Sequence, residues 1–510
     1  MNTNAQEEIK RWVLAWQRKL HRWTMNDKDK KHKDLFNLVY DPRTLQEAWN
    51  HVKANKGSRT AGMDGQTRRS IESGLGVEKF LEYLHKELKR GTYLPQPVIE
   101  KLIPKPGGKF RRLGIPTLKD RVVQQALRMV LEPIFEADFY VSSYAYRPGR
   151  RAQDAIQNIF HFIRPCVGYT WAVEGDIRGC FDNVHHGVLM EEIRKRITDK
   201  KILRIIRIIL KAGVMTELGV YQRTITGTPQ GGILSPLLAN IYLSRLDQYF
   251  NQKWKRYCSS SNRCRLRKKG LATCYLIRFA DDFVILVKGT QEQANSLKEE
   301  AAQYLKEDLK MELSWEKTRV TSVKEGFDFL GFRMVLKENH RGQIGVRVYP
   351  SKKSLKSVQK KIKEITSIAT TNLSLTDTLV ELNRVLRGWT NYFRFAHSKK
   401  TFSYLDHYSW RRVYRWMRKK HRRLAAKTLV QRYCPDWNFR EGEFVRFNPS
   451  KVKVERYGYR GNRIPTPWNQ GGINPQRGRR GDRLPVWESP YLESLESCCA
   501  PVKVSGEPDA

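Results

Sequence analysis

The segment Tyr275–Val287 (YLIRFADDFVILV) constrains the fold more than any other part of this 510-residue chain. Two apolar runs rich in β-forming residues flank an adjacent acidic pair, Asp281 and Asp282, and this pattern predicts a β-hairpin. An ordinary hairpin turn would favour Asn-Gly or Asp-Gly. Because two like charges between apolar strands are costly to bury unless a cation neutralises them, the pair indicates a metal site.

A third acidic residue, Asp176, ends another apolar stretch, Trp171–Asp176, and Gly179 permits a tight turn after it. Alone this signal would be weak, because Asp often caps helices. Together with Asp281 and Asp282, it supplies the carboxylates that two-metal nucleotidyl transfer requires. In that chemistry one Mg²⁺ ion activates the 3′-hydroxyl and the other holds the triphosphate.

The chain is strongly basic, with 95 Lys plus Arg against 52 Asp plus Glu and a formal charge of +43. Such an excess would destabilise a compact fold by self-repulsion, so it favours a nucleic-acid partner over a membrane surface. No run of about eighteen apolar residues occurs, as a bilayer-spanning helix would need. The first residues lack the apolar core of a signal peptide, so we expect a cytoplasmic protein without a membrane partner.

The eight cysteines are scattered, and none forms a CxxC pair. Cys258 and Cys264 are too isolated to suggest a zinc site. We therefore expect a reduced protein without structural zinc or disulfide bonds.

The organisation changes along the chain. Residues 1–35 have a basic helical pattern, and helices and strands alternate from about 40 to 345, with helices expected at Arg121–Phe135 and Lys200–Leu210. Beyond Pro350 the pattern is purely helical. Its basic stretch Trp410–Arg423 indicates a module with an apolar stripe in the core and another face that meets phosphates. After about residue 430 the chain is rich in Gly, Pro and Arg, which suits a flexible tail or a small irregular module.

A series of motifs occurs in order, and together they are specific. Over roughly residues 40–430 the chain resembles the reverse transcriptase–maturases encoded by bacterial group II introns. The motifs are NKGSRTAGMDG (55–65), IPKPGGKFRRLGIP (103–116), DRVVQQAL (120–127), SYAYRPGRRAQDA (143–155), GDIRGCFDN (175–183), GTPQGGILSPLLANIYL (227–243), FADD (279–282), LSWEKT (313–318), FDFLGF (327–332) and LRGWTNYF (386–393).

The resemblance implies a right-hand polymerase of α+β class, with fingers and palm around an antiparallel sheet and an all-α thumb or maturase domain. The expected divisions are a helical extension and start of the fingers (1–100), fingers and palm (101–345), a helical domain X (346–430) and a basic C-terminal region that binds DNA or is flexible (431–510).

The resemblance also implies the residues of the catalytic site. The Mg²⁺ ligands are Asp176, Asp281 and Asp282, assisted by the carbonyl of Ile177. In the fingers, Lys105 and Arg111 would grip the incoming triphosphate, a role that suits cationic hydrogen-bond donors.

Three further residues and one segment receive roles in the same way. Phe181 would be the gate that rejects a ribose 2′-hydroxyl, although a core Phe is the alternative. Gln230 would sit against the nascent base pair, where neighbouring glycines allow close backbone approach. Lys317 would donate a proton to the leaving pyrophosphate, or it is a surface lysine. Residues 329–332 would form the primer grip.

The chain departs from the family pattern in two ways. Phe279 replaces the Tyr that usually begins the catalytic tetrad, which removes only a hydroxyl, so activity should survive. No His follows His421, so we expect no HNH-type endonuclease with a cysteine-bound zinc, as in the compact endonuclease-lacking relatives that prime on a nascent DNA strand.

The main hypothesis is an RNA-directed DNA polymerase and splicing maturase that binds group II intron RNA, a target DNA primer and dNTPs during retrohoming. One alternative is a splicing factor in which the polymerase site is a relic, but the intact carboxylates argue against it. The other is a host-adopted reverse transcriptase used in defence or repair, which only the coding context would distinguish.

Overall fold

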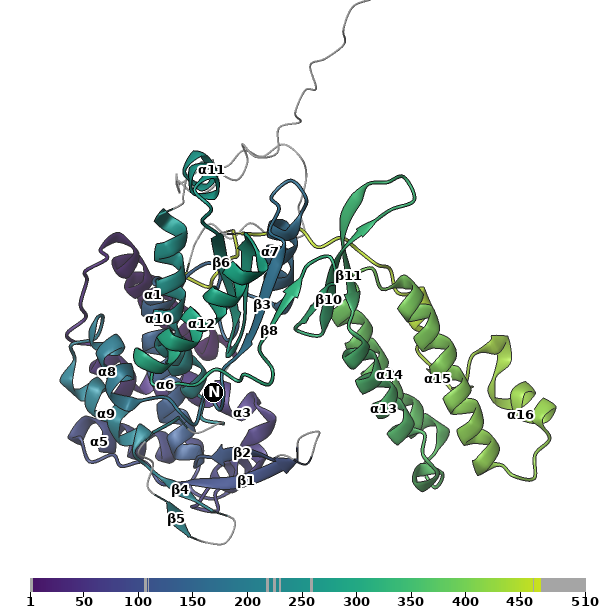
Figure 1. Cartoon of the computed structure of the whole chain (residues 1–510). Helices are drawn as coiled ribbons and strands as arrows, with labels where there is room; N and C mark the ends of the chain where they lie inside the picture. The colour runs from purple at the N-terminus through teal and green to yellow at the C-terminus, as the bar shows by residue number, and fades with distance from the viewer. Residues whose placement is uncertain are drawn as a thin grey trace, which may run out of the picture.

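The computed structural model shows a large mixed body of helices and strands with a smaller helical domain beside it (Figure 1). It describes residues 3–104, 108, 110–216, 220–222, 226–228, 231–256, 260–461 and 463–468. Two predicted site residues, Lys105 and Gln230, lie outside the described residues. The combination of antiparallel sheets, many helices and a helical domain confirms the predicted α+β class.

The central sheet of the body has the strand order β6-β7-β3-β8, with every pairing antiparallel. Its strands are β6 (Thr273–Phe279), β7 (Asp282–Lys288), β3 (Trp171–Asp176) and β8 (Arg319–Ser322). Successive side chains point to opposite faces, so Leu276 and Ile285 join one core while Ile277 and Val284 join another. Both faces are therefore buried, which explains why the predicted hairpin reads as two continuous apolar runs.

The turn of this hairpin differs in one detail from the prediction of two turn carboxylates. Phe279 pairs with Asp282, so Ala280 and Asp281 form the turn and Asp282 is the first residue of β7. Ala280 has a φ of 59°, in the left-handed region. A two-residue hairpin turn needs a positive φ because its twist must match that of the strands.

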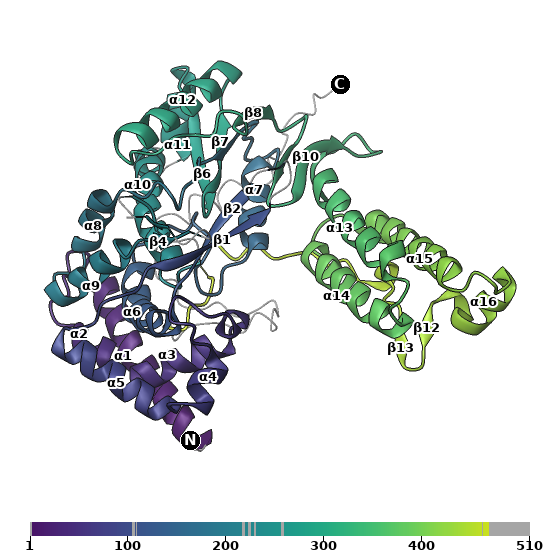
Figure 2. The same ribbon diagram turned by 90° about the horizontal axis from the view of Figure 1, so that it is seen from below.

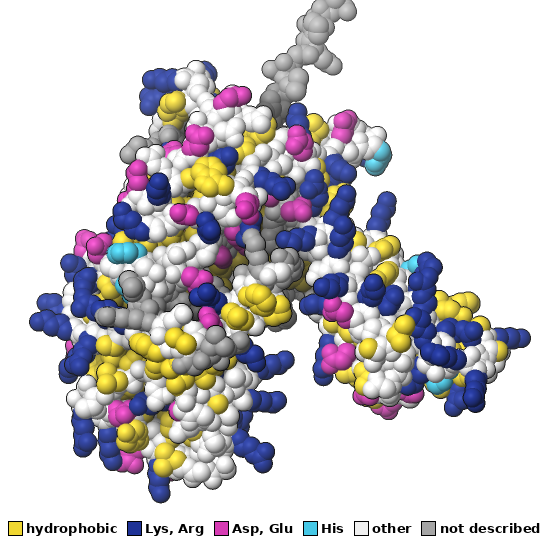
Figure 3. Space-filling model, turned by 60° about the horizontal axis from the view of Figure 1, so that its bottom comes forward, with side chains coloured by type: hydrophobic (Ala, Val, Ile, Leu, Met, Phe, Trp, Pro, Cys, Tyr) yellow, Lys and Arg dark blue, Asp and Glu magenta, His cyan; other side chains and the backbone are white. Residues whose placement is uncertain are grey.

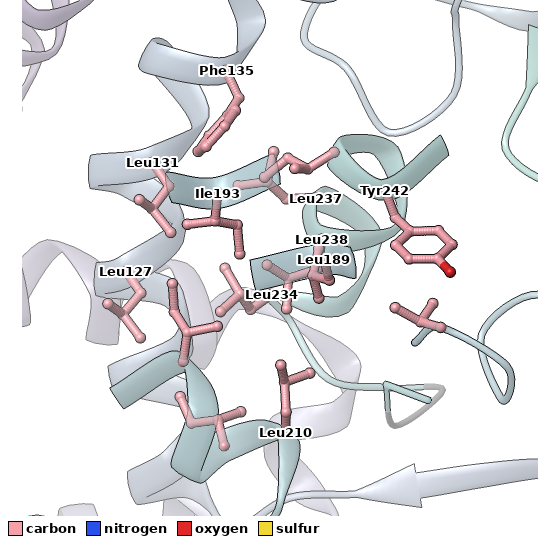
Figure 4. Close-up of a cluster of buried hydrophobic side chains, with 14 of the residues drawn as sticks. Leu127, Leu131, Phe135, Leu189, Ile193, Leu210, Leu234, Leu237, Leu238 and Tyr242 are labelled. Carbon is pink, nitrogen blue, oxygen red and sulfur yellow. The ribbon is translucent and has the colours of Figure 1, made fainter. Parts of the chain in front are cut away.

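Helices cover the sheet and build most of the body. The predicted helix Arg121–Phe135 lies within α6 (Leu118–Glu136), and α9 (Lys200–Leu210) has the predicted bounds. Figure 4 shows leucine, isoleucine and aromatic side chains of α6, α8 (His186–Arg194), α9 and α10 (Ser235–Arg256) facing one another in the core. The other helices of the body are α1 (Thr3–Asn26), α2 (Phe36–Tyr40), α3 (Pro42–Ala54), α4 (Arg68–Ser73), α5 (Val77–Arg90), α7 (Ala152–Ile163), α11 (Ser260–Lys268) and α12 (Gln291–Glu307).

A second sheet, β2-β1-β4-β5, lies below the central sheet in Figure 1. Its strands are β1 (Val98–Pro104), β2 (Phe110–Ile115), β4 (Val214–Met215) and β5 (Tyr221–Gln222). A Cβ added at Gly231 would lie 2.5 Å from the carbonyl oxygen of Gly114 on β2. The backbone after the TPQ sequence therefore packs directly onto the predicted fingers hairpin.

The helical domain follows a three-stranded sheet of β9 (Phe327–Phe329), β10 (Phe332–Glu338) and β11 (Ile344–Pro350). Figure 2 shows its long helices side by side, apart from the body. The helices have their own core, in which the predicted stripe of Leu379, Leu382 and Leu386 is fully buried. They are α13 (Lys352–Ile365), α14 (Leu375–Phe393), α15 (Lys399–Lys420) and α16 (Ala426–Tyr433).

The chain does not end in the helical domain. After β12 (Arg440–Glu441) and β13 (Phe444–Val445), residues 452–468 cross back to the body, where they form the yellow trace in Figure 1. We call residues 452–468 the return segment. It joins α7 through an ion pair of Arg460 with Asp154 at 2.6 Å, and it reaches α1 where the indole of Trp468 donates to Gln17 at 3.3 Å.

Short 3-10 turns complete the described structure: η1 (Lys56–Arg59), η2 (Ile368–Thr370), η3 (Pro435–Trp437) and η4 (Pro449–Lys451). None of the helices within the described ranges is long and apolar enough to cross a membrane.

Candidate active site

The three predicted carboxylates lie together at one end of the central sheet. Asp176, the last residue of β3, lies directly opposite Asp282, the first residue of β7, and Asp281 precedes it in the turn. The ring of Phe283 covers Gly175 so closely that an added Cβ would lie 2.2 Å from it, so this position requires glycine. Two strands far apart in the sequence thus place these acids together.

The carboxylates perturb one another. The pKa of Asp282 is raised to about 7, first by burial and then by the charges of Asp281 and Asp176, with which it also shares a side-chain hydrogen bond. Burial and the charge of Asp176 also raise the pKa of Asp281, while Arg111 and Lys317 oppose that shift. Burial and mutual repulsion therefore both oppose the charged forms of these carboxyl groups.

Lys317 reaches this cluster. Its Nζ lies 2.6 Å from Oδ2 of Asp176, and this hydrogen bond raises the pKa of the ammonium. The backbone amide of Ser314 donates to the Asp176 carbonyl at 2.8 Å, and Leu313 forms an antiparallel bridge with Ile177. The LSWEKT segment is thus docked beside β3, which places Lys317 in the site rather than on a remote surface.

The donor set suits a hard divalent cation. Among the described residues, no three His, Cys, Asp or Glu side chains are arranged to hold a metal ion, and one Asp176 oxygen is paired with Lys317. However, the clustered acids offer only oxygen ligands, which Mg²⁺ prefers. A cation would also offset the burial and the mutual repulsion that raise the pKa values of Asp281 and Asp282. The chemistry of these residues therefore suits a hard divalent cation.

Phe181 lies in the turn after β3, five residues beyond Asp176, and is half-buried. The backbone amide of Thr228 donates to the carbonyl of Phe181 at 2.7 Å. A Cβ at Gly227 would lie 2.7 Å from the carbonyl oxygen of Asp182, so only glycine allows this approach. The described start of the loop that carries Gln230 is therefore packed against Phe181.

Arg111 approaches from the second sheet. It is an exposed residue of β2, and its positive charge acts on Asp281 and on Tyr146. The structure therefore brings this predicted phosphate-binding residue to the face of the acidic cluster, as a triphosphate grip would require.

Sequence reasoning missed Arg278 and its partners. Arg278 and Asp247 form an ion pair at 2.6 Å, with both side chains completely buried. The same guanidinium donates to the carbonyl of Ala280 at 3.0 Å and to the hydroxyl of Ser143 at 2.9 Å. An arginine inside an otherwise apolar strand was the available signal, because a buried charge requires a partner.

Tyr146 was also missed as a site residue, although it belongs to the quoted SYAYRPGR motif. Its ring contacts that of Phe181 edge-on, with centroids 6.4 Å apart and an interplanar angle of 74°. Tyr146 also has a φ of 57°. A bulky residue in this conformation could not have been recognised from sequence.

Comparison with known families agrees with this geometry. Residues 103–334 match the family described as reverse transcriptase (RNA-dependent DNA polymerase), and residues 355–434 match the group II intron maturase-specific domain. The protein YkfC of Escherichia coli is 37% identical over 354 residues, which cover 66% of this chain and 91% of YkfC. The chain belongs to the group II intron reverse transcriptase family.

Other relatives of this reverse transcriptase are longer. The group II intron-encoded protein LtrA of Lactococcus lactis is 37% identical over 343 residues, which cover 58% of this chain and 56% of LtrA. The chain thus matches about half the length of LtrA. Among solved structures, apo telomerase from Candida tropicalis aligns with a TM-score of 0.38 and 15% identity over 64% of this chain and 63% of that one.

Proposed function

We propose that this reverse transcriptase copies RNA into DNA at the cluster of Asp176, Asp281 and Asp282, and that it serves as the maturase of a group II intron. The observation that carries the proposal is the pairing of Asp176 opposite Asp282, with Asp281 in the adjoining turn. This arrangement lies within the matched polymerase region, and the maturase-specific match covers the helical domain.

The residues of the site would have distinct roles in the reaction. The three carboxylates and the carbonyl of Ile177 would hold two Mg²⁺ ions, which when bound would activate the primer 3′-hydroxyl and stabilise the triphosphate charge. Arg111, together with Lys105, would neutralise the incoming triphosphate.

The remaining site residues would select and process the nucleotide. Phe181 would exclude the ribose 2′-hydroxyl, and Gln230 would lie against the nascent base pair. Lys317, whose exposed side chain is paired with Asp176, would give a proton to the leaving pyrophosphate.

The charge distribution supports the RNA partner. Lys and Arg side chains crowd the helical domain at the right of the space-filling view (Figure 3). Near the end of α15, an open cavity of about 630 Å³ is lined largely by basic residues, namely Lys419, Lys420, His421, Arg422 and Arg423 with Thr371, Asn372 and Leu424. Basic surfaces of this kind bind phosphate backbones.

From these features we infer partners and a setting. The chain would bind group II intron RNA for splicing, and then use a target DNA primer and dNTPs to copy that RNA at the nucleoid of a bacterial cell. The sequence has no histidine after His421 that could serve an HNH-type zinc site. We therefore propose no endonuclease activity for these residues.

Primer extension on an RNA template with dNTPs and Mg²⁺ tests the polymerase. Wild type should give long cDNA, whereas Asp281→Asn combined with Asp282→Asn should give none, because two metal ligands lose their charge at almost constant volume. Glu299→Ala, at an exposed position of α12, is the matched control and should retain full activity.

The maturase is tested separately with intron RNA. Wild type and the double Asn variant should both promote splicing and bind the RNA with a steep dependence on salt. Tight RNA binding by a wild-type protein that makes no cDNA would instead favour the splicing-factor alternative.

A further inference from the structure

Tyr146 belongs to a short buried segment that presents only one ring to the active site. Its neighbours Tyr144, Ala145 and Arg147 are buried, whereas Tyr146 is 48% exposed. Its φ of 57° is an outlier for a bulky aromatic residue. Strained backbone conformations of this kind persist only where the surrounding contacts hold them in place, and they are common at functional sites.

Contacts that do not involve the ring hold this backbone. Asn240 donates to the carbonyl of Ala145 at 2.8 Å, and the amide of Tyr144 donates to the carbonyl of Arg278 at 3.0 Å. On the other side, Arg147 forms a buried ion pair with Glu136 at 2.7 Å. The protein therefore fixes the backbone on both sides of Tyr146 and leaves its ring available to the site.

The surroundings of the ring are those of the nucleotide site. The ring of Tyr146 contacts that of Phe181 edge-on, with centroids 6.4 Å apart. The Tyr146 hydroxyl also interacts electrostatically with the negative Asp281 and the positive Arg111. Tyr146 thus lies among the gate, a carboxylate and the triphosphate-binding arginine.

We propose that Tyr146 is a second determinant of sugar specificity, which holds the ring of Phe181 against the position of a ribose 2′-hydroxyl. This inference rests on the proposed polymerase function and on the gate role of Phe181. A half-buried phenylalanine alone can turn or retreat from a 2′-hydroxyl. The edge-to-face contact with Tyr146 restricts that movement, so the two rings form one wall.

The test compares incorporation of dCTP and CTP opposite a template G by wild type, Tyr146→Asn and Tyr146→Phe. Asparagine tolerates the left-handed backbone, so Tyr146→Asn removes the ring without adding strain. We expect its preference for dCTP over CTP to fall about fivefold, which corresponds to about 1 kcal/mol, the scale of an edge-to-face aromatic contact. Tyr146→Phe keeps the ring and should therefore keep the wild-type preference.

A double-mutant cycle with Phe181→Val distinguishes a wall of two rings from general damage. The double variant should discriminate no worse than Phe181→Val alone, because Tyr146 has no ring left to hold once Phe181 is replaced. Tyr83→Asn, at an exposed position of α5, controls for the loss of a surface tyrosine and should leave the preference unchanged.

Three outcomes would overturn the inference while leaving the polymerase intact. These are an unchanged preference in Tyr146→Asn, equal losses for dCTP and CTP, and independent additive effects in the cycle. A wild-type protein that incorporates neither nucleotide would overturn the proposed function itself, so the two failures are distinguishable.

Discussion

Arg278 and Asp247 form a fully buried ion pair directly beneath the turn that carries Asp281. The guanidinium is shared between Asp247, the carbonyl of Ala280 and the hydroxyl of Ser143. The pair thus joins α10, the hairpin turn and the segment that precedes Tyr146. One buried charge therefore links Ala280 in the hairpin turn to the segment of Tyr146, and both residues have a positive φ.

Removing one member of this ion pair should strongly lower the stability of the protein. Asp247→Ala leaves the Arg278 charge buried without its carboxylate, so we expect the free energy of unfolding to fall by about 3–5 kcal/mol. Urea denaturation followed by tryptophan fluorescence measures this change. Asp29→Ala, at an exposed position, should stay within about 0.5 kcal/mol of wild type. A loss no larger than in that control would show that solvent reaches Arg278 after all.

Lys317 offers a test of proton donation. If the ammonium protonates the leaving pyrophosphate, Lys317→Ala should lower the single-turnover rate about 100-fold or more. Lys317→Arg should be nearly as slow, because a guanidinium keeps the charge on Asp176 but does not give up its proton. Rapid-quench primer extension measures these rates, and Lys324→Ala serves as an exposed lysine control. Near-normal rates in Lys317→Arg would indicate a purely electrostatic role.

The return segment should contribute to the stability of the body. Asp154 is almost completely buried and accepts two hydrogen bonds from the Arg460 guanidinium, at 2.7 and 2.6 Å. Arg460→Ala removes a charged partner from a buried carboxylate, so we expect a loss of about 1.5–3 kcal/mol in urea unfolding. Arg456→Ala changes an exposed arginine of the same segment and should have little effect. Equal effects of the two variants would contradict this role.

His161 should make stability depend on pH. Burial, and then the charge of Arg164, lower the pKa of His161 to about 4, whereas an unfolded histidine titrates near 6.5. Between these values the unfolded chain binds more protons than the folded one, so stability must rise with pH. The contribution is complete above about pH 6.5 and is lost progressively as the pH falls towards 4.

The variant His161→Gln isolates this effect from the other histidines. Thermal or urea unfolding of both proteins between pH 4 and 7 gives their difference in stability. This difference should favour the wild type increasingly as the pH rises. A difference that does not vary with pH would mean that His161 titrates normally, in spite of its stacking on Tyr459 at 5.1 Å.

Local sequence patterns predicted those elements whose structure depends on local contacts. The helix Lys200–Leu210 was predicted with its observed bounds because its apolar spacing is regular, and in the structure the side chain of Asp199 caps its start. The hairpin of Tyr275–Val287 was recognisable from its apolar runs. Even there, the assignment of Asp282 to the strand instead of the turn depended on pairing with Phe279.

Contacts between distant residues could not be predicted in this way. Arg278 and Asp247 are 31 positions apart, and Asp154 and Arg460 are 306 apart, so no periodicity relates them. Lys317 remained ambiguous in the sequence because only the docking of its segment beside β3 brings it to Asp176. For Tyr146 the decisive facts are a backbone angle and a neighbouring ring, both set by tertiary packing.

The return segment gives the helical domain a second connection to the body. The domain leaves the body after Pro350 and is tied to it again where residues 452–468 run along α7. The helical domain also contacts α7 directly, because the side chain of Gln153 donates to the carbonyl of Tyr392 on α14 at 3.0 Å. A chain cut between α16 and residue 452 would therefore keep every residue of the candidate site and this direct contact, but it would hold the helical domain to the body by one covalent connection instead of two.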